Sequence, residues 1–513
     1  MARLTAFIGF MGAGKTTAAR GLAAARGVAH LDADALVEER LGRPIQEVFD
    51  TDGEAAFRSA EEQVVAELLE RGDEVVVSLG GGAVRSERVQ SALAGCTTVL
   101  VDIGVDEAWA RATAAGAPER PLARDRDAFA RLHAERAPLY ERLADAFLPQ
   151  ADVDCVVRAD PALRALEQAR ADGLPVRLAW AHAASGEYPV FVGAGALRVR
   201  PPGLAGRAVC VTDEAVAEHH LGSLAGLSGV IEIPPGEEHK TLETAERVWR
   251  ALAAQGVTRA DHLVALGGGV VGDLAGFCAA CFQRGIAVVQ APTTVVSQVD
   301  SAYGGKTGVD LPEAKNYVGA YHQPAAVLAD TTTLATLPPE EHAAGYAEVL
   351  KTALIAGGTL WERIADGAPV DDDVILACAR TKLAVVAADE RDGGRRQVLN
   401  LGHTVGHALE TVLGYGTLRH GEAVGLGLLA ALRLSGQPEL REQCEQLLEA
   451  AGLPTRTPGG VDPEAIVGAT RLDKKRTSQA RTPFVLVRAA GDVVHGQDVA
   501  DDDVLAAVRE LRP

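Results

Sequence analysis

Short apolar runs alternate with alanine-rich, amphipathic stretches along the first part of the chain. The apolar run 4–10 is followed by a glycine-rich turn and the alanine-rich stretch 16–26, which predicts a buried strand, a loop and a helix. Further apolar runs bounded by Gly, Asp and Arg have the length and composition of strands buried on both faces of a parallel sheet. These runs are residues 75–79, 98–103, 189–192, 208–212, 263–266 and 287–291. The pattern predicts an α/β fold.

The pattern changes after residue 336. From there on Ala, Leu, Glu and Arg dominate, and glycine pairs at 357–358, 393–394 and 459–460 separate what reads as a series of helices. The chain of 513 residues exceeds the roughly 250 to 300 residues at which single hydrophobic cores stop growing. We therefore predict an α/β domain at 1–165, a linker at 166–175, a second α/β domain at 176–335 and a mainly helical domain at 336–513.

Charge and cysteine usage narrow the possible partners. The net charge of −20, with 70 acidic and 50 basic residues and no Lys/Arg-rich block, argues against nucleic acid. The first apolar run is too short for a signal peptide or a membrane span, so we expect a cytoplasmic protein without a membrane partner. Seven scattered cysteines favour reduced thiols. Cys278 and Cys281 form an isolated CxxC pair among Phe and Ala, which favours core packing over a redox or zinc role.

The sequence GFMGAGKT at 9–16 fits the phosphate-binding P-loop pattern, directly after a predicted strand and at the start of a predicted helix. Glycines let main-chain N–H groups surround phosphate oxygens, Lys15 reaches the β- and γ-phosphates, and Thr16 can hold Mg²⁺. The residues expected to bind ATP are Gly12, Ala13, Gly14, Lys15, Thr16 and Thr17. The motif says nothing about the phosphoryl acceptor.

The acceptor is indicated by five motifs in order: HLDAD at 30–34, GEAAFR at 53–58, SLGGG at 78–82, RPL at 120–122 and RAPLY at 136–140. With the P-loop, this set resembles shikimate kinase over residues 1 to about 160. The resemblance implies that Asp32 supports Mg²⁺ and that Arg120, from a lid over ATP, is catalytic with Lys15 and Asp34. It implies that shikimate is bound by Asp34, Arg58, Gly80, Gly81, Gly82 and Arg136.

These residue types suit phosphorylation of a small carboxylated polyol. Arginines bind its carboxylate, and an aspartate orients or deprotonates the attacking hydroxyl. The alternative is another small-molecule P-loop kinase, such as a gluconate kinase, which the pairing of Asp34 with Arg58 and the triple glycine disfavours.

A second glycine motif, GGGVVGDLAG at 267–276, follows the predicted strand 263–266. The glycines allow the main chain to approach a pyrophosphate closely, but the motif is not GxGxxG. It therefore indicates a dinucleotide or another phosphate-bearing ligand. The alternative is a tight turn that binds no ligand. His403 and His407, spaced i and i+4, face the same way if their segment is helical. Two histidines with Glu348 and His420 would form a zinc site of two histidines and one carboxylate with an open position.

The motifs QVDSAYGGKTG at 298–308, LNLGH at 399–403 and DKK at 473–475 resemble 3-dehydroquinate synthase across residues 176–513. The resemblance implies that Glu348, His403 and His420 hold Zn²⁺ or Co²⁺. The residues implied to bind NAD are Asp213, Glu237, Lys240, Gly268, Gly269, Val270, Asp273, Thr293 and Thr294. Those implied to surround the substrate are Asp300, Lys306, Lys315, Asn316, Lys351, Lys382, Arg396, Asn400, His407 and Lys474, with Arg284 donated by the second subunit of a homodimer.

The reaction of that family suits these residues. NAD transiently oxidises the C5 hydroxyl of 3-deoxy-D-arabino-heptulosonate 7-phosphate, phosphate is eliminated, and reduction with aldol closure gives 3-dehydroquinate. Lys306, Lys382 and Arg396 would neutralise phosphate and carboxylate, and Asn400 with His407 would relay protons, so these five are the expected catalytic residues. The alternatives are a metal-dependent polyol dehydrogenase, which would release NADH, and a regulatory protein in which one half has decayed.

The sequence departs from the family pattern at three places. Ala302-Tyr303 before the glycine pair, Asp310-Leu311 after it, and residues 281–283 before Arg284 are not those expected. They bring local packing into question more than catalysis, because the polar positions are filled.

Overall fold

The computed structural model describes residues 4–71, 73–114, 123–149, 154–414, 416–472 and 483–513. The chain forms two compact units. The N-terminal unit is Met1–His182 with Pro189–Phe191 and Val199–Gly203, and the C-terminal unit is Ala183–Tyr188, Val192–Arg198 and Leu204–Pro513. Strands β6 (Arg177–Ala183) and β7 (Gly186–Val192) contain the boundary between the units.

The N-terminal unit is built on parallel strands in the order β2-β3-β1-β4-β5. The strands are β1 (Thr5–Ile8), β2 (Ala29–Asp32), β3 (Val75–Ser78), β4 (Thr97–Asp102) and β5 (Ala146–Pro149). Phe7, Val77 and Val99 are fully buried in its core. Strands β1, β3 and β4 confirm the runs predicted at 4–10, 75–79 and 98–103.

Eight helices accompany these strands within the described residues: α1 (Lys15–Arg26), α2 (Ala33–Leu41), α3 (Ile45–Thr51), α4 (Glu54–Leu69), α5 (Glu87–Leu93), α6 (Val105–Ala112), α7 (Arg126–Leu143) and α8 (Cys155–Ala171). The linker predicted at 166–175 begins inside α8, whose Leu166 is fully buried. Arg26 of α1 forms ion pairs with Asp160 at 2.6 Å and Glu167 at 2.9 Å on α8. An Ala/Arg/Glu stretch has the same composition as a solvated connector or as a packed helix, so only the tertiary contacts distinguish the two.

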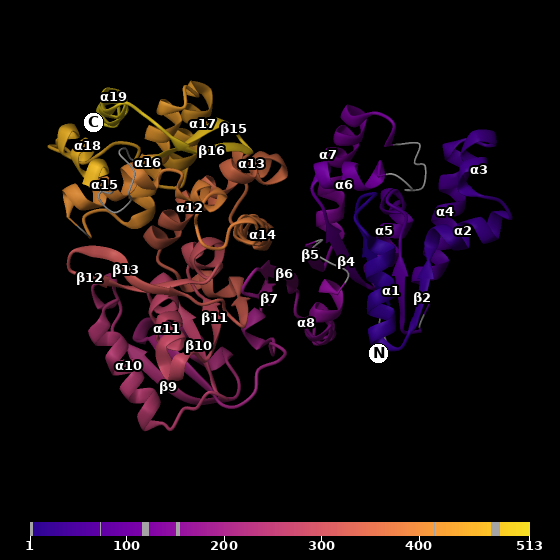
Figure 1. Cartoon of the computed structure of the whole chain (residues 1–513), viewed down its shortest axis with the longest axis horizontal. Helices are drawn as coiled ribbons and strands as arrows, with labels where there is room; N and C mark the ends of the chain where they lie inside the picture. Colours follow the sequence, from indigo (N-terminus) through magenta and orange to yellow (C-terminus); the bar gives the residue numbers. More distant parts are fainter. Residues whose placement is uncertain (1–3, 72, 115–122, 150–153, 415, 473–482) are drawn as a thin grey trace. The chain divides into compact units, whose positions relative to one another are not determined.

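The C-terminal unit contains five parallel strands in the order β14-β11-β10-β8-β9. Its strands are β8 (Ala208–Asp213), β9 (Leu227–Ile233), β10 (His262–Gly267), β11 (Ala287–Pro292) and β14 (Ala326–Ala329), and its helices are α9 (Glu214–His220), α10 (Leu242–Ala254) and α11 (Gly269–Cys281). Helix α11 packs on β10 and β11 (Figure 1). Cys278 is buried in this core, as predicted, whereas Cys281 is exposed.

The helical part of the unit follows residue 336, as predicted. Its helices are α12 (Pro339–Ala356), α13 (Gly358–Ala365), α14 (Asp372–Ala388), α15 (His403–Leu413), α16 (His420–Leu434), α17 (Pro438–Ala450), α18 (Pro463–Leu472) and α19 (Asp501–Arg509). Two antiparallel hairpins were not predicted: β12 (Lys306–Leu311) with β13 (Ala314–Tyr321), and β15 (Phe484–Ala489) with β16 (Asp492–Gln497). None of the described helices is long and apolar enough to cross a bilayer.

Candidate active sites

The P-loop joins β1 to α1. Gly12 and Gly14 adopt left-handed conformations with φ of 85° and 87°. Lys15 begins α1, and its Nζ donates to the carbonyl of Phe10 at 3.1 Å, so the ammonium lies over the loop. No side chain caps the N-terminus of α1, which leaves its main-chain N–H groups for an anion.

Beside this loop, the Asp32 carboxylate accepts hydrogen bonds from two hydroxyl groups. Its Oδ2 accepts hydrogen bonds from Thr16 Oγ1 at 3.0 Å and Ser78 Oγ at 2.9 Å, and His30 Nε2 lies 3.0 Å from the same Ser78 hydroxyl. A hydroxyl and a carboxylate held together beside a phosphate loop are the oxygen ligands that Mg²⁺ prefers. The structure therefore brings together the two predicted magnesium residues.

The predicted acceptor residues also converge. A Cβ on Gly80 would lie 2.6 Å from Asp34 Oδ1 and 2.7 Å from Glu61 Oε1, and one on Gly82 would overlap the Arg58 guanidinium. A side chain at either glycine would therefore have to displace the charged groups that meet the β3 loop. Glu61, which sequence reasoning missed, is buried and forms an ion pair with Arg58 at 2.5 Å. Its spacing three residues after Arg58 on a helix was the available signal.

Two side chains of α7 hydrogen-bond to the main chain of the glycine loop 80–82. Arg136 Nη1 donates to the carbonyl of Gly81 at 3.2 Å, and the Tyr140 hydroxyl donates to the same oxygen at 2.5 Å. Arg136 is buried, which suits a fixed carboxylate receptor. Arg120 lies outside the described residues.

Burial raises the pKa of Asp34, with a further contribution from nearby Asp32. Asp34 keeps a large exposed surface, so solvent weakens this rise. Burial likewise raises the pKa of Glu61, against the effect of Arg58. A carboxylate with a raised pKa is a stronger base, as proton removal from a hydroxyl requires.

In the C-terminal unit the glycine motif lies between β10 and α11. Gly268 and Gly269 are at the N-terminus of α11, which no side chain caps, and Val270 follows in its first turn. A Cβ on Gly268 would lie 3.0 Å from Thr294, and Thr293 donates its N–H to Gly267. Asp213 is the last residue of β8 and caps α9. These residues come together at the carboxyl ends of parallel strands, where open α/β sheets bind nucleotides.

Three carboxylates surround the buried ammonium of Lys240 at this edge of the sheet. Its Nζ lies 2.6 Å from Glu237, 3.5 Å from Asp273 and 3.8 Å from Asp310. Burial raises the pKa of Asp273 to about 6, although Lys240 acts against the rise. Sequence reasoning had noted Asp310 only as a departure from the family pattern.

Three helices bring the predicted metal ligands together. Glu348 comes from the middle of α12, and His403 and His420 begin α15 and α16. A Cβ on Gly421 would overlap the carbonyl of Ala344, and one on Gly427 would overlap that of Gly402. These two glycines therefore let α16 approach both partner helices closely.

The three ligand atoms fit a metal ion. Oε1 of the buried Glu348 lies 3.6 Å from His403 Nε2 and 3.4 Å from His420 Nε2, and the three ligand atoms lie within 4.8 Å of one another. Within the described part of the chain, neither Glu348 oxygen has a hydrogen-bond partner of good geometry. A buried carboxylate beside two imidazoles suits Zn²⁺ or Co²⁺.

Partners on the other ring nitrogens orient both imidazoles. His403 Nδ1 lies 3.2 Å from the carbonyl of Leu401, and His420 Nδ1 lies 3.6 Å from Glu410 Oε1. In each case Nε2 is left to bind metal. Burial lowers the pKa of His403 to about 3, whereas Glu348 and Glu410 raise the pKa of His420 to about 9 against its burial. Glu410, a further residue that sequence reasoning missed, also pairs with Lys315 at 3.2 Å.

Two buried lysines extend the cluster. Lys351 Nζ lies 2.5 Å from Glu348 and 3.6 Å from Asp300, and Lys382 Nζ lies 2.5 Å from Asp300. Although burial acts to raise it, the two lysines hold the pKa of Asp300 at about 2. Burial lowers the pKa of Lys382. The arrangement is a buried network of two lysines and two carboxylates that includes the predicted metal ligand Glu348.

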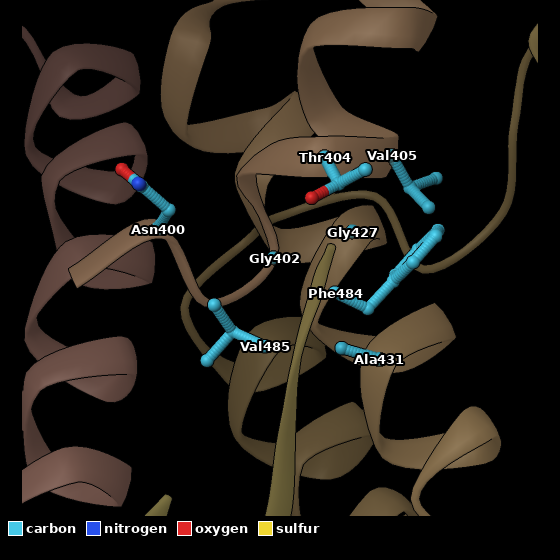
Figure 2. Close-up of a pocket in the computed structure, with 8 residues that line it drawn as sticks. All are labelled: Asn400, Gly402, Thr404, Val405, Gly427, Ala431, Phe484 and Val485. Atoms are coloured by element: carbon cyan, nitrogen blue, oxygen red, sulfur yellow. The ribbon is translucent and has the colours of Figure 1, made fainter. Parts of the chain in front are cut away.

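Arg396 and Asn400 belong to the segment before α15. Arg396 is fully buried and donates to the carbonyls of Glu390 at 2.5 Å and Gly304 at 2.9 Å. Asn400 borders a small pocket whose other lining residues are Gly402, Thr404, Val405, Gly427, Ala431, Phe484 and Val485. In Figure 2 the Asn400 amide points away from Phe484 and Val405, and no charged residue lines the pocket. This pocket is therefore not the catalytic site.

The remaining predicted substrate residues differ in their surroundings. Lys306 pairs with Asp392 at 2.5 Å, and the exposed His407 has its ring 5.3 Å from that of His403. Asn316 lies in the turn region of the β12–β13 hairpin with a φ of 53°. Arg284 is exposed in a left-handed turn with no ion-pair partner among the described residues. Lys474 lies outside those residues.

Family models match three consecutive parts of the chain. The model for shikimate kinase matches residues 11–158, that for the 3-dehydroquinate synthase N-terminal domain matches 230–344, and that for its C-terminal domain matches 345–476. The order agrees with the two resemblances inferred from the sequence.

Individual proteins agree with these models. The 3-dehydroquinate synthase of Halorhodospira halophila is 43% identical over 338 residues, which are 62% of this chain and 95% of that protein. The synthase of Azotobacter vinelandii is 44% identical over 331 residues, 60% of this chain and 89% of that protein.

Two solved structures resemble the chain in fold. A 2-deoxy-scyllo-inosose synthase complexed with carbaglucose-6-phosphate, NAD⁺ and Co²⁺ has a TM-score of 0.58 at 25% identity, covering 65% of this chain and 99% of that one. The 2-epi-5-epi-valiolone synthase ValA from Streptomyces hygroscopicus, with NAD⁺ and Zn²⁺ bound, has a TM-score of 0.58 at 26% identity, covering 63% and 96%.

Proposed function

The chain belongs to the 3-dehydroquinate synthase family and joins to it an N-terminal shikimate kinase, and from this premise we propose how its residues divide the work of the two reactions. The protein is a bifunctional enzyme of aromatic amino acid biosynthesis. It phosphorylates shikimate with ATP and Mg²⁺, and it converts 3-deoxy-D-arabino-heptulosonate 7-phosphate to 3-dehydroquinate and phosphate with NAD and Zn²⁺ or Co²⁺.

In the kinase half, we propose that the P-loop and Lys15 hold the ATP phosphates while Thr16 and Asp32 hold Mg²⁺. Asp34 accepts the proton of the attacking hydroxyl, a role supported by its raised pKa. Arg58 and Arg136 bind the shikimate carboxylate, and Glu61 holds the Arg58 guanidinium in place. The convergence of Asp34, Arg58 and the triple glycine is the observation that carries this assignment.

In the synthase half, we propose that Glu348, His403 and His420 hold the metal, which would polarise the substrate hydroxyl. Lys351 and Lys382 bind substrate oxygens, and Asp300 keeps both ammonium groups in position. Lys306, Lys315, Asn316 and Arg396 complete the pocket, with Asn400 and His407 moving protons. The buried carboxylate of Glu348, whose Oε1 lies within 3.6 Å of the Nε2 atoms of both His403 and His420, carries the metal assignment.

We propose that NAD binds at the edge formed by Gly268, Gly269 and Val270, with its ribose hydroxyls near Glu237, Lys240 and Asp273. The uncapped N-terminus of α11 favours the pyrophosphate. Asp213, Thr293 and Thr294 border the same edge of the sheet.

We further propose a cytoplasmic homodimer in which Arg284 serves the site of the neighbouring subunit. Its exposure and the absence of an ion-pair partner among the described residues support this role. Seven cysteines without disulfides, six of them buried, suit a reducing compartment.

Product analysis on the purified full chain tests the assignment. With ATP, Mg²⁺ and shikimate we expect shikimate 3-phosphate, and with the heptulosonate phosphate, NAD and Zn²⁺ we expect 3-dehydroquinate without net NADH. Accumulating NADH at 340 nm would instead indicate a polyol dehydrogenase, and faster phosphorylation of gluconate than of shikimate would contradict the kinase assignment.

A further inference from the structure

The β12–β13 hairpin is irregular where it carries two of the proposed substrate residues. Val309 pairs with Val318, but Leu311 pairs with Ala314. One residue of β12, Asp310, therefore lies opposite three of β13, which include Lys315 and Asn316. A bulge of this kind changes the direction of side chains and needs a substitute for the hydrogen bonds that the ladder has lost.

The side chain of Asp310 supplies that substitute. Its Oδ1 accepts the main-chain N–H of Asn316 at 2.5 Å. Asn316 is at the centre of the bulge with a φ of 53°, a left-handed conformation that non-glycine residues adopt at a cost. The hydrogen bond from this N–H to the Asp310 carboxylate stabilises the bulge in place of the missing hydrogen bond to the main chain of β12.

The main chain of Asp310 is tied elsewhere. The N–H of Asp310 donates to the carbonyl of Lys240 at 2.7 Å. Asp310 and Thr241, the residue after Lys240, form an isolated parallel β-bridge. The same Oδ1 lies 3.8 Å from Lys240 Nζ. Asp310 thus connects the segment proposed to bind NAD with the bulge proposed to bind substrate.

We propose that Asp310 is a positioning residue of the synthase, which fixes the β13 bulge so that Lys315 and Asn316 meet the substrate and which fastens that bulge to Lys240. The proposal rests on the roles given above to Asn316 and Lys240. Asp310 itself touches neither ligand in this account.

Two substitutions separate its functions. Asp310→Ala removes the acceptor for the Asn316 N–H, so KM for the heptulosonate phosphate should rise about tenfold or more. Asp310→Asn keeps an oxygen acceptor and should restore KM to within about threefold of wild type. The main-chain tie to Lys240 survives both changes, so the Kd for NAD, measured by calorimetry on the full chain, should shift by less than about threefold.

Glu313→Ala is the matched control, because Glu313 is an exposed carboxylate in the same turn. It should leave KM and the Kd for NAD unchanged. The NAD-binding stoichiometry from the same calorimetry reports the fraction of folded synthase unit in each preparation. Equal KM values for wild type and Asp310→Ala, or parallel rises in KM and the NAD Kd in both Asp310 variants, would overturn the positioning role.

Two further variants distinguish this failure from failure of the underlying assignments. Asn316→Ala should raise KM for the substrate, and Lys240→Met should weaken NAD binding. If these variants behave as expected while Asp310→Ala does not, only the positioning role is wrong. If Asn316→Ala also leaves KM unchanged, the proposed role of Asn316 is wrong and the inference about Asp310 is overturned with it.

Discussion

The phosphate loop of the kinase half and the lysine cluster of the synthase half obtain their positive charge from different sources. In the phosphate loop the potential comes from main-chain N–H groups and from the half-buried Lys15, whose ammonium donates to the carbonyl of Phe10. In the synthase half it comes from buried side chains, and Lys351 and Lys382 are each held by carboxylates. Removing one member of the buried cluster leaves an uncompensated charge, which costs about 3 to 5 kcal/mol.

The difference predicts how each half responds to substitution. Single changes in the phosphate loop should remove kinase activity and leave the fold intact. Changes in the synthase cluster should affect both unless the substituted side chain keeps its shape. Each half also serves as the internal control for the other, because both reactions are measured on one polypeptide.

The largest effect is expected at the metal ligands. Glu348→Gln and His403→Ala should reduce synthase activity to background and lower the zinc content, because each removes one of three ligands. Chelation followed by excess Mg²⁺ should likewise silence the synthase alone. Elemental analysis and both assays test this, and an unchanged zinc content in both variants would contradict the ligand assignment.

Lys15→Ala should reduce the kinase reaction to background, because the β- and γ-phosphates lose their lysine ammonium. Its synthase activity and unfolding temperature should equal those of wild type. Comparable losses of both activities in a folded variant would show that the two sites are not independent.

Asp34→Asn should lower kcat for shikimate by about 10² to 10⁴, the range of general acid–base catalysis. Because only the ionised carboxylate accepts a proton and its pKa is raised, the wild-type rate should fall on acidification at a pH above about 3.9, the ordinary pKa of aspartate. The pH profile of kcat/KM measures this limb. If the rate of the Asn variant fell on acidification in the same way, a group other than Asp34 would be responsible for the fall.

The smallest change is a partial recovery of activity. Arg284→Ala and Lys382→Ala should each be inactive as synthases, yet mixed dimers of the two should contain one intact site and one site that lacks both groups. Random pairing makes half of the dimers mixed, so about a quarter of wild-type activity should return. Co-expression of the two variants tests this, and no recovery would mean that Arg284 serves its own subunit.

Local pattern was sufficient for much of the structure. The apolar runs predicted β1, β3, β4, β8, β10 and β11, because burial on both faces imposes continuous apolar residues. The P-loop could be predicted from the sequence because its glycines, Lys15 and Thr16 lie within a few residues of one another. The i and i+4 spacing likewise predicted that His403 and His407 share a face of α15, and their rings lie 5.3 Å apart.

Other features required the tertiary structure, because they depend on residues distant in sequence. Glu61 and Glu410 resemble ordinary surface carboxylates until folding buries them against Arg58 and His420. The β15–β16 hairpin was missed although its sequence, FVLVRAAGDVVHGQ, is rich in valine, because the segments before it read as helices. Asp310 was visible only as an unexpected residue, and its role emerges from contacts to Lys240 and Asn316 on separate strands and loops. The sequence by itself determined which chemical groups are present, whereas packing decided which of them lose water, and desolvation is what makes a charged contact strong.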